Sequence, residues 1–282
     1  MADQSNKNAY KPCTLFRPQP DNNAERYVVE EYFDTYTLRS EVPPNSLVIG
    51  RYSVLPYYNE LLTDLHNNGS KLINNNMQHK YIANAWWIPD VQYATPQTWT
   101  DETIYQAPKD MQFIVKGCTN SRKNQWGQMM RAEDRRDALN KAAILKTDSL
   151  IGQQEILYRE YVPLESYGEL IGGCPISNEW RFFCFRDKVL CYGYYWSIAD
   201  QDIIDSVKLD GAAFDLVKDL SRVIGVYTNF YVLDIAKTVK GDWILIEVND
   251  GCCSGLSECD PHELYKNLKE AINDSDLSTV AY

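Results

Sequence analysis

Two periods of apolar residues alternate along the second half of the chain. Apolar residues three or four positions apart predict amphipathic helices over 131–146 and 211–225, and Pro261 begins a third over 261–273. Apolar runs and strict alternation predict strands instead. These strands lie at 111–117, 154–164, 229–237 and 242–250, with a hairpin over 178–197. Strands and helices mixed in this order predict an α/β (α+β) fold.

The first half predicts a smaller α/β unit behind a polar arm. Residues 1–25 are polar and contain three prolines, so we expect a loosely held arm. An apolar run at 46–54 predicts a strand, and leucines on one face of 57–69 predict a helix ending near Gly69. A further strand is expected at 71–75. This order predicts a small α/β domain over 26–95.

Composition narrows the function classes. Hydrophobic residues make up 44% of the 282 residues, which is ample for a core. The formal charge of −11 disfavours general binding to nucleic acid or to anionic lipid. We find no stretch near the ~18 apolar residues of a membrane span and no signal-peptide pattern. Eight cysteines without such a signal predict reduced thiols in a cytoplasmic protein.

The last strand ends in side chains that suit a metal ion. The segment 243–251 reads WILIEVNDG, and side-chain alternation puts Glu247 and Asn249 on one face. Depending on the loop of the hairpin, Asp234 lies opposite Asn249 or opposite Glu247, and either register keeps the three residues together. Two carboxylates and an amide oxygen suit Mg²⁺ bound with phosphates. The alternatives are a polar outer face of a half-exposed sheet or a turn that follows the strand.

A lysine and a polar loop form a candidate phosphate site. Lys116 ends an apolar strand, and a loop of small polar residues with Ser121 and Lys123 follows it. A lysine at this place can reach phosphate oxygens while backbone N–H groups cradle them. The sequence has no GxxxxGK[ST] motif, which excludes a P-loop site.

Two arginines lie inside otherwise apolar strands. A covered arginine in a strand needs an anionic partner, so Arg159 and Arg181 are candidates to bind one. Arg181 shares its strand face with Glu179, two residues away. An ion pair with Glu179, or a place at an exposed sheet edge, is the alternative for Arg181.

Four blocks in this order carry a family resemblance: FIVKGCTNSRKNQW, ILYREYVPL, NEWRFFCFRDKVL and VLDIAKTVKGDWILIEVND. They resemble the ATP-grasp superfamily, and more closely its two-arginine-one-lysine clade. They are similar also to the eukaryotic assembly factors of translation initiation factor two, which share a divergent ATP-grasp fold. The resemblance covers about residues 95–265 and implies an ATP-grasp domain over 96–282, preceded by the smaller N-terminal α/β domain.

The resemblance implies a role for each candidate residue. Lys116, Arg159 and Arg181 match the lysine and the two arginines of the clade. Residues 160–162 fall where the family holds adenine. The implied nucleotide-binding set is Lys116, Ser121, Lys123, Arg159, Glu160, Tyr161, Val162 and Arg181, with Lys116 and Arg181 in catalysis and with Asp234, Glu247 and Asn249 as ligands of Mg²⁺ or Mn²⁺.

Two function classes are consistent with this resemblance. The first is an ATP-dependent ligase that phosphorylates a carboxylate and lets an amine attack the acylphosphate, forming an amide or peptide bond. Its carboxylate and amine substrates are not specified by the sequence, and a peptide or protein can be one of them. The second is an ATP-binding assembly factor that grips a protein partner without ligating anything.

Overall fold

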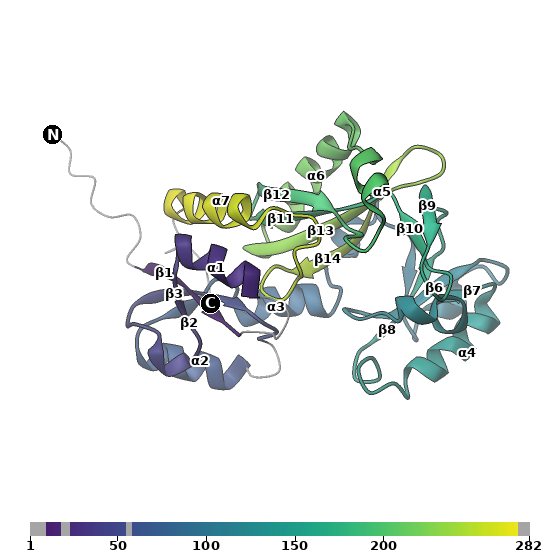
Figure 1. The fold of residues 1–282 in the computed structure, drawn as a ribbon. Coiled ribbons are helices and arrows are strands. Elements are labelled where there is room, and N and C mark those ends of the chain that lie inside the picture. The colour runs from purple at the N-terminus through teal and green to yellow at the C-terminus, as the bar shows by residue number, and fades with distance from the viewer. Residues whose placement is uncertain (1–9, 18–22, 55–57, 276–282) are drawn as a thin grey trace.

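Three four-stranded sheets form the framework of the protein. The computed structural model describes residues 10–17, 23–54 and 58–275. The first sheet has the order β2-β1-β3-β4, the central sheet β12-β11-β13-β14 and the third sheet β5-β8-β6-β7. They follow one another from left to right in Figure 1. This mixture of helices and sheets confirms the predicted α/β class.

The first sheet is parallel and covered on both faces. Its strands are β1 (Lys11–Phe16), β2 (Asp34–Tyr36), β3 (Ser46–Arg51) and β4 (Lys71–Leu72), with helices α1 (Asn23–Tyr32) and α2 (Tyr58–Asn67). Every residue of β3 is buried, as expected for a strand between two helical layers. Leu47 and Ile49 pack in the cluster that contains α1, whereas Val48 packs against α2.

The expected polar arm is partly wrong. Lys11–Phe16 forms β1, an inner strand of the first sheet, although residues 1–9 and 18–22 lie outside the described residues. Pro12 is tolerated because pairing with β2 begins only at Cys13, so its missing N–H lies near the start of the strand. Three prolines close together hid a short strand whose last four residues are buried.

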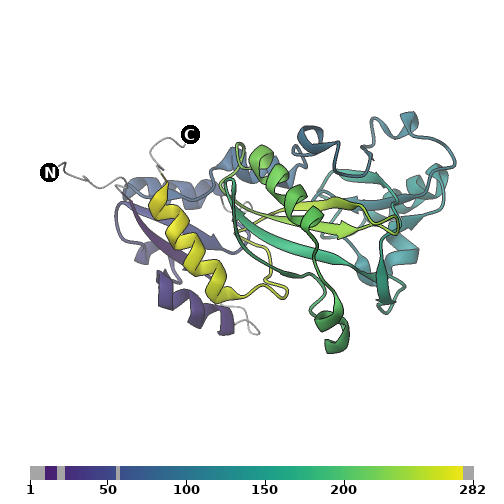
Figure 2. The same ribbon diagram turned by 90° about the horizontal axis from the view of Figure 1, so that it is seen from above.

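The central sheet consists of two antiparallel hairpins, as the sequence predicts. Its strands are β11 (Glu179–Phe185), β12 (Lys188–Tyr194), β13 (Phe230–Lys237) and β14 (Trp243–Asp250). One face packs against α6 (Gly211–Ile224) and the other against α7 (Pro261–Asp274). In Figure 2, α6 (green) lies across the strands of this sheet, and α7 (yellow) lies beside α1 (purple). Phe183 and Val232 lie beneath α7. The charged residues Arg181 and Asp234 lie further along the same face of the sheet.

The third sheet is small and antiparallel. Its strands are β5 (Thr98–Trp99), β6 (Phe113–Gly117), β7 (Arg131–Ala132) and β8 (Ile156–Glu160), and α4 (Arg135–Leu145) packs against it. Asp134 caps α4 by accepting a hydrogen bond from the Asp137 N–H. A separate hairpin follows, with strands β9 (Ser166–Glu169) and β10 (Pro175–Ser177).

The remaining helices are short. They are α3 (Asn76–Ala83), α5 (Gln201–Ser206), the 3₁₀ turns η1 (Arg39–Glu41), η3 (Pro89–Val91), η4 (Ile104–Gln106) and η5 (Lys123–Gln125), and the π-turn η6 (Trp126–Met130). Within residues 10–17, 23–54 and 58–275, every helix is too short or too polar to cross a bilayer.

A buried ion pair links the first sheet to the C-terminal part. Glu25 on α1 accepts hydrogen bonds from Arg51 at 2.6 and 3.0 Å, and the hydroxyl of Tyr265 on α7 donates to the same carboxylate. Arg51 also donates to the carbonyl oxygens of Gly251 and Ser254, just beyond β14. Arg51, at the end of β3, therefore holds the loop that follows β14 in place.

We expect Glu25→Ala to lower the free energy of unfolding by about 3–5 kcal/mol, because Arg51 would stay buried without its carboxylate. Chemical denaturation followed by fluorescence measures the change. The matched control is Glu30→Ala, which removes a partly exposed carboxylate paired with Arg26 on the same helix and should cost less than about 1 kcal/mol. Equal losses for the two variants would contradict this role of Glu25.

Candidate functional site

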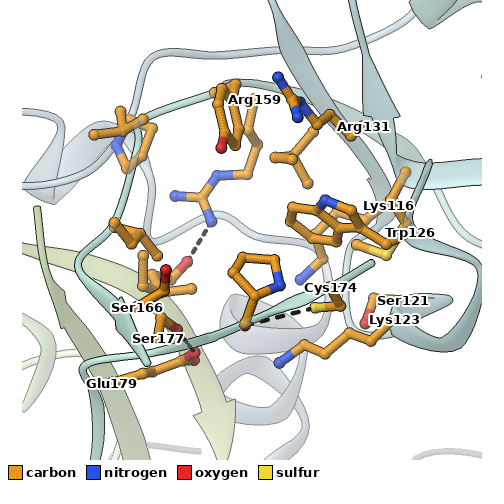
Figure 3. Close-up of a pocket in the computed structure, with 18 of the residues that line it drawn as sticks. Lys116, Ser121, Lys123, Trp126, Arg131, Arg159, Ser166, Cys174, Ser177 and Glu179 are labelled. Atoms are coloured by element: carbon orange, nitrogen blue, oxygen red, sulfur yellow. Dashed lines mark hydrogen bonds between the residues drawn. The ribbon is translucent and has the colours of Figure 1, made fainter. Parts of the chain in front are cut away.

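A cavity of about 240 Å³ lies between the third sheet and β14. The loop after β6 and the β9–β10 hairpin complete its walls, and Figure 3 shows cationic side chains entering it. Seven residues that the sequence predicts for nucleotide binding line this cavity: Lys116, Ser121, Lys123, Arg159, Glu160, Tyr161 and Val162. Arg181, the eighth, lies in a neighbouring cavity.

One part of this first cavity is apolar. Its walls there are formed by Ile114, Met130, Val162, Leu164, Ile244 and Ile246. The chain segment 160–162 is held against the third sheet, since the N–H of Glu160 donates to Gln97 O at 2.8 Å and that of Tyr161 to Gln112 O at 2.9 Å. An uncharged ring can bind between such walls beside a fixed backbone edge.

Arg159 is a buried cation without a carboxylate partner. It is 6% exposed, and it donates to the hydroxyls of Thr95 at 2.6 Å and Thr98 at 3.3 Å and to the carbonyl of Ile246. Among the described residues, no Asp or Glu forms an ion pair with it. Burial lowers the pKa of Arg159 to about 10, which still leaves it charged at neutral pH. A buried, charged guanidinium at a cavity wall suits an anionic ligand.

Lys116 is the next-to-last residue of β6, the strand that pairs with β8. Burial, with the positive charges of Arg159 and Lys123 nearby, lowers the pKa of Lys116 to about 7. Its amino group also contacts the carboxylate of Glu247 on β14, which favours the charged form. Lys116 thus joins the third sheet to the predicted metal ligands.

Lys123 lies where the two cavities meet. Its amino group donates to the Tyr195 hydroxyl at 2.8 Å and lies over the rings of Tyr195 and Trp196, at 4.1 and 4.7 Å from their centres. Burial opposes its charge, but attraction from Glu179 and Tyr195 outweighs burial and raises the pKa of Lys123 above its usual value. Figure 3 shows the amino group of Lys123 on the same side of the first cavity as Glu179.

The three predicted metal ligands are neighbours in the structure. Asp234 pairs with Glu247 across the hairpin, and the amide of Asn249 donates to both carboxylates, at 2.9 and 3.1 Å. The register shifts by one residue at Ile246, and this bulge turns Glu247 away from the α6 side that Leu245 faces. The register with Asp234 opposite Glu247 is therefore the one adopted.

These residues fit a divalent cation, but they differ in access. Glu247 lines both cavities and Asn249 the second, whereas Asp234 is fully buried behind them. The described chain contains no group of three or more His, Cys, Asp or Glu side chains that could hold a metal ion. A cation here would take two carboxylates and an amide oxygen from the chain and further oxygens from a ligand, as Mg²⁺ does with phosphates.

Arg181 pairs with Asp234, and the alternatives considered from the sequence are wrong. Its guanidinium binds both carboxylate oxygens of Asp234, at 2.9 and 2.8 Å, and a third N–H donates to Gly255 O at 2.8 Å. β11 is an inner strand, so Arg181 is not at a sheet edge. Glu179 instead accepts a hydrogen bond from Ser177 at 3.1 Å.

A second cavity of about 590 Å³ adjoins the first. Ser121, Lys123 and Glu247 line both, so the two cavities share a polar boundary. The far wall of the second cavity comes from the N-terminal part of the chain, with Ser53, Val54, His79, Ile82 and Ala83. Arg181 and Asn249 also line this second cavity.

Several lining residues were not assigned from the sequence. Trp126 and Trp196 line the first cavity, and His79 and Asp250 the second. His79 lies on α3, a helix that the sequence patterns do not predict. His79 belongs to no sequence motif. Its place at the cavity depends on how the chain folds.

The sequence matches a family model over residues 74–268, which is more than half of the chain. That model describes an ATP-grasp domain, family 3 of the two-arginine-one-lysine clade. A comparison with curated proteins gives no match.

Solved structures share the fold at low sequence identity. The D-cycloserine synthetase DcsG has a TM-score of 0.59 at 10% identity, over 93% of this chain and 99% of that chain. The ATP-grasp ligase PsnB, complexed with precursor peptide PsnA2 and AMPPNP, has a TM-score of 0.56 at 9% identity, over 95% and 98%. Cdc123 from Schizosaccharomyces pombe has a TM-score of only 0.44 at 12% identity, over 64% and 87%.

Proposed function

This chain belongs to the ATP-grasp domain proteins of family 3 in the two-arginine-one-lysine clade, and we propose that it is an ATP- and Mg²⁺-dependent ligase. The reaction joins a carboxylate to an amine through an acylphosphate. Similarity in fold to DcsG and PsnB, a synthetase and a ligase by name, supports this class of reaction.

The observation that carries the proposal is the charge of Arg159. It is buried at the wall of the first cavity and bound only to uncharged groups of the described chain. Lys116 and Lys123 reach the same cavity. A triphosphate satisfies three such cations at once, while the apolar part beside residues 160–162 takes the adenine.

Each predicted residue has a place in this proposal. The phosphates of ATP contact Lys116, Lys123 and Arg159, with Ser121 at the boundary of the two cavities. Asp234, Glu247 and Asn249 would hold Mg²⁺ or Mn²⁺, with Glu247 and Asn249 lining the cavity and Asp234 buried behind them. When bound, the metal neutralises phosphate charge and orients the phosphoryl group.

The transfer needs no covalent nucleophile on the protein. A carboxylate oxygen of the substrate attacks the γ-phosphorus, the bond to the β-phosphate oxygen breaks, and ADP leaves. Arg181 and Lys123 lie on the acceptor side of this phosphoryl group, where fixed positive charge stabilises the charge that develops. An amine then displaces phosphate from the acylphosphate.

The second cavity is our candidate for the carboxylate and amine substrates, either free amino acids or the end of a peptide. We place the smaller N-terminal domain, residues 26–95, which supplies one wall of this cavity, before an ATP-grasp domain over residues 96–282. All eight cysteines are free thiols in the structure, which supports a cytoplasmic location.

A substrate screen beside a pull-down tests the proposal. The protein is incubated with ATP, Mg²⁺ and a pool of amino acids and dipeptides, with ADP and ligated products measured by mass spectrometry. We expect ADP to form only when a carboxylate and an amine are both present. A stoichiometric protein partner, with no substrate-dependent ADP from the pool, would instead identify an assembly factor.

We expect Arg159→Met to weaken binding of Mg²⁺·AMPPNP by about 1.5–3 kcal/mol, or roughly 10- to 150-fold in Kd, because one charge-assisted phosphate contact is lost. Titration calorimetry measures the affinity. The control is Arg136→Met on the exposed side of α4, which should bind like the parent. Unchanged affinity in Arg159→Met would remove this residue from the nucleotide site.

A further inference from the structure

A histidine and an aspartate meet at the wall of the second cavity. His79 on α3 is only 1% exposed, and its Nδ1 contacts a carboxylate oxygen of Asp250 at the end of β14. Both residues line the second cavity, and neither lines the first. The pair therefore faces the candidate substrate site without touching the candidate nucleotide site.

The pair is held rigidly. Asp250 accepts the N–H of Cys252 at 2.9 Å and the amide of Asn74 at 3.4 Å, so its carboxylate has a fixed direction. The ring of Tyr58 packs edge-on against the imidazole, with 6.0 Å between ring centres. The two ring nitrogens of a histidine have distinct partners, and the partner of one sets the tautomer of the other.

Nδ1 is used by Asp250, so Nε2 is the nitrogen left for a ligand. None of the described residues forms a hydrogen bond with Nε2. With the proton of Nδ1 directed at the carboxylate, Nε2 of the neutral ring is an acceptor. The cations Lys123 and Arg181, which suit the phosphate end of an acylphosphate, line the same cavity as this acceptor.

We propose that His79, oriented by Asp250, receives a proton from the attacking amine through Nε2 during the second step of the proposed ligase reaction. This inference rests on the proposed function. The nitrogen lone pair forms the C–N bond, and the C–O bond to phosphate breaks with its electron pair leaving on phosphate. One N–H proton passes to Nε2 and then to solvent, while Asp250 stays ionised.

The arrangement also has a purely structural interpretation, as a link between α3 and β14. A structural link affects both chemical steps equally, because it acts through the fold. A proton acceptor affects only the step in which the amine attacks. A variant of His79 tested with two different nucleophiles therefore distinguishes the two interpretations.

The test compares two nucleophiles in His79→Gln. The protein is given ATP, Mg²⁺ and a pool of amino acids, with or without hydroxylamine. Hydroxylamine is largely unprotonated near neutral pH and traps acylphosphates without base catalysis, losing its N–H proton to solvent. We expect hydroxamate formation to stay within about twofold of the parent, and amide formation to fall by about 10²–10⁴-fold. His66→Gln, the same change at an exposed position on α2, should affect neither.

Each result decides something. If His79→Gln lost hydroxamate and amide formation in parallel and kept its AMPPNP affinity, the pair would have only a structural role and the proposal would be overturned. Unchanged amide formation in this variant would also overturn the proposal. If His79→Gln does not fold, Asp250→Asn is used and should show the same preferential loss of amide formation. If the parent protein forms neither product, the proposed ligase function itself is wrong and this inference falls with it.

Discussion

Replacing Arg181 with lysine is expected to reduce ADP formation from the amino-acid pool by about 10²–10³-fold. The guanidinium holds Asp234 through two hydrogen bonds and Gly255 O through a third. Lysine keeps the charge but lacks the planar fork, so it cannot hold both oxygens of Asp234 while facing the second cavity. Steady-state ADP release measures the loss.

Nucleotide affinity should change far less in this variant, because Arg181 lines the second cavity and not the first. Arg222→Lys, on the exposed side of α6, is the matched control and should react like the parent. An Arg181→Lys protein that turns over normally would remove Arg181 from the phosphoryl-transfer step. A proportional loss of AMPPNP affinity would place it in nucleotide binding instead.

The second large effect concerns the metal. We expect Glu247→Gln to weaken binding of AMPPNP in the presence of Mg²⁺ by about 10- to 100-fold, because the carboxylate of the metal site that lines both cavities is lost. Excess EDTA should weaken binding to the parent protein by a similar factor. It should have little further effect on the variant, since both changes remove the same contact.

Lys116 makes this prediction sharper. It contacts Glu247 in the structure, so the variant frees an ammonium group that can bind phosphate directly. Without metal, Glu247→Gln should therefore bind AMPPNP at least as tightly as the parent does without metal. Calorimetry with and without Mg²⁺ gives both affinities, and Glu270→Gln on α7 is the exposed control. Equal affinity of the parent protein in Mg²⁺ and in EDTA would sink the metal assignment.

Local patterns in the sequence were enough to predict most of the ATP-grasp part. The hairpin of β13 and β14 follows from alternation and a polar turn, and it brings Asp234 next to Glu247. The interior strands that carry Arg159 and Arg181 were recognisable because an arginine interrupts an apolar run. Features that depend on a few neighbouring residues of one strand can be predicted from such local patterns.

Features that depend on two separated segments were not predictable. Arg181 pairs with Asp234 because the two are directly opposed on neighbouring strands, whereas Glu179 lies two residues along its own strand. The bulge at Ile246 depends on how β13 and β14 pair, and the contact of its carbonyl with Arg159 joins the central sheet to the third sheet. β1 was hidden by prolines, and the place of His79 at the second cavity depends on how α3 packs against β14.

The central claim is that ATP bound between the sheets phosphorylates a carboxylate. The most direct measurement uses amino acids and dipeptides with oxygen-18 in their carboxylate groups, followed by mass spectrometry of the phosphate released. An acylphosphate intermediate transfers one labelled oxygen to phosphate for each ADP formed, and this is the result we predict. Formation of ADP with unlabelled phosphate, or no formation of ADP with any carboxylate and amine, would contradict the account.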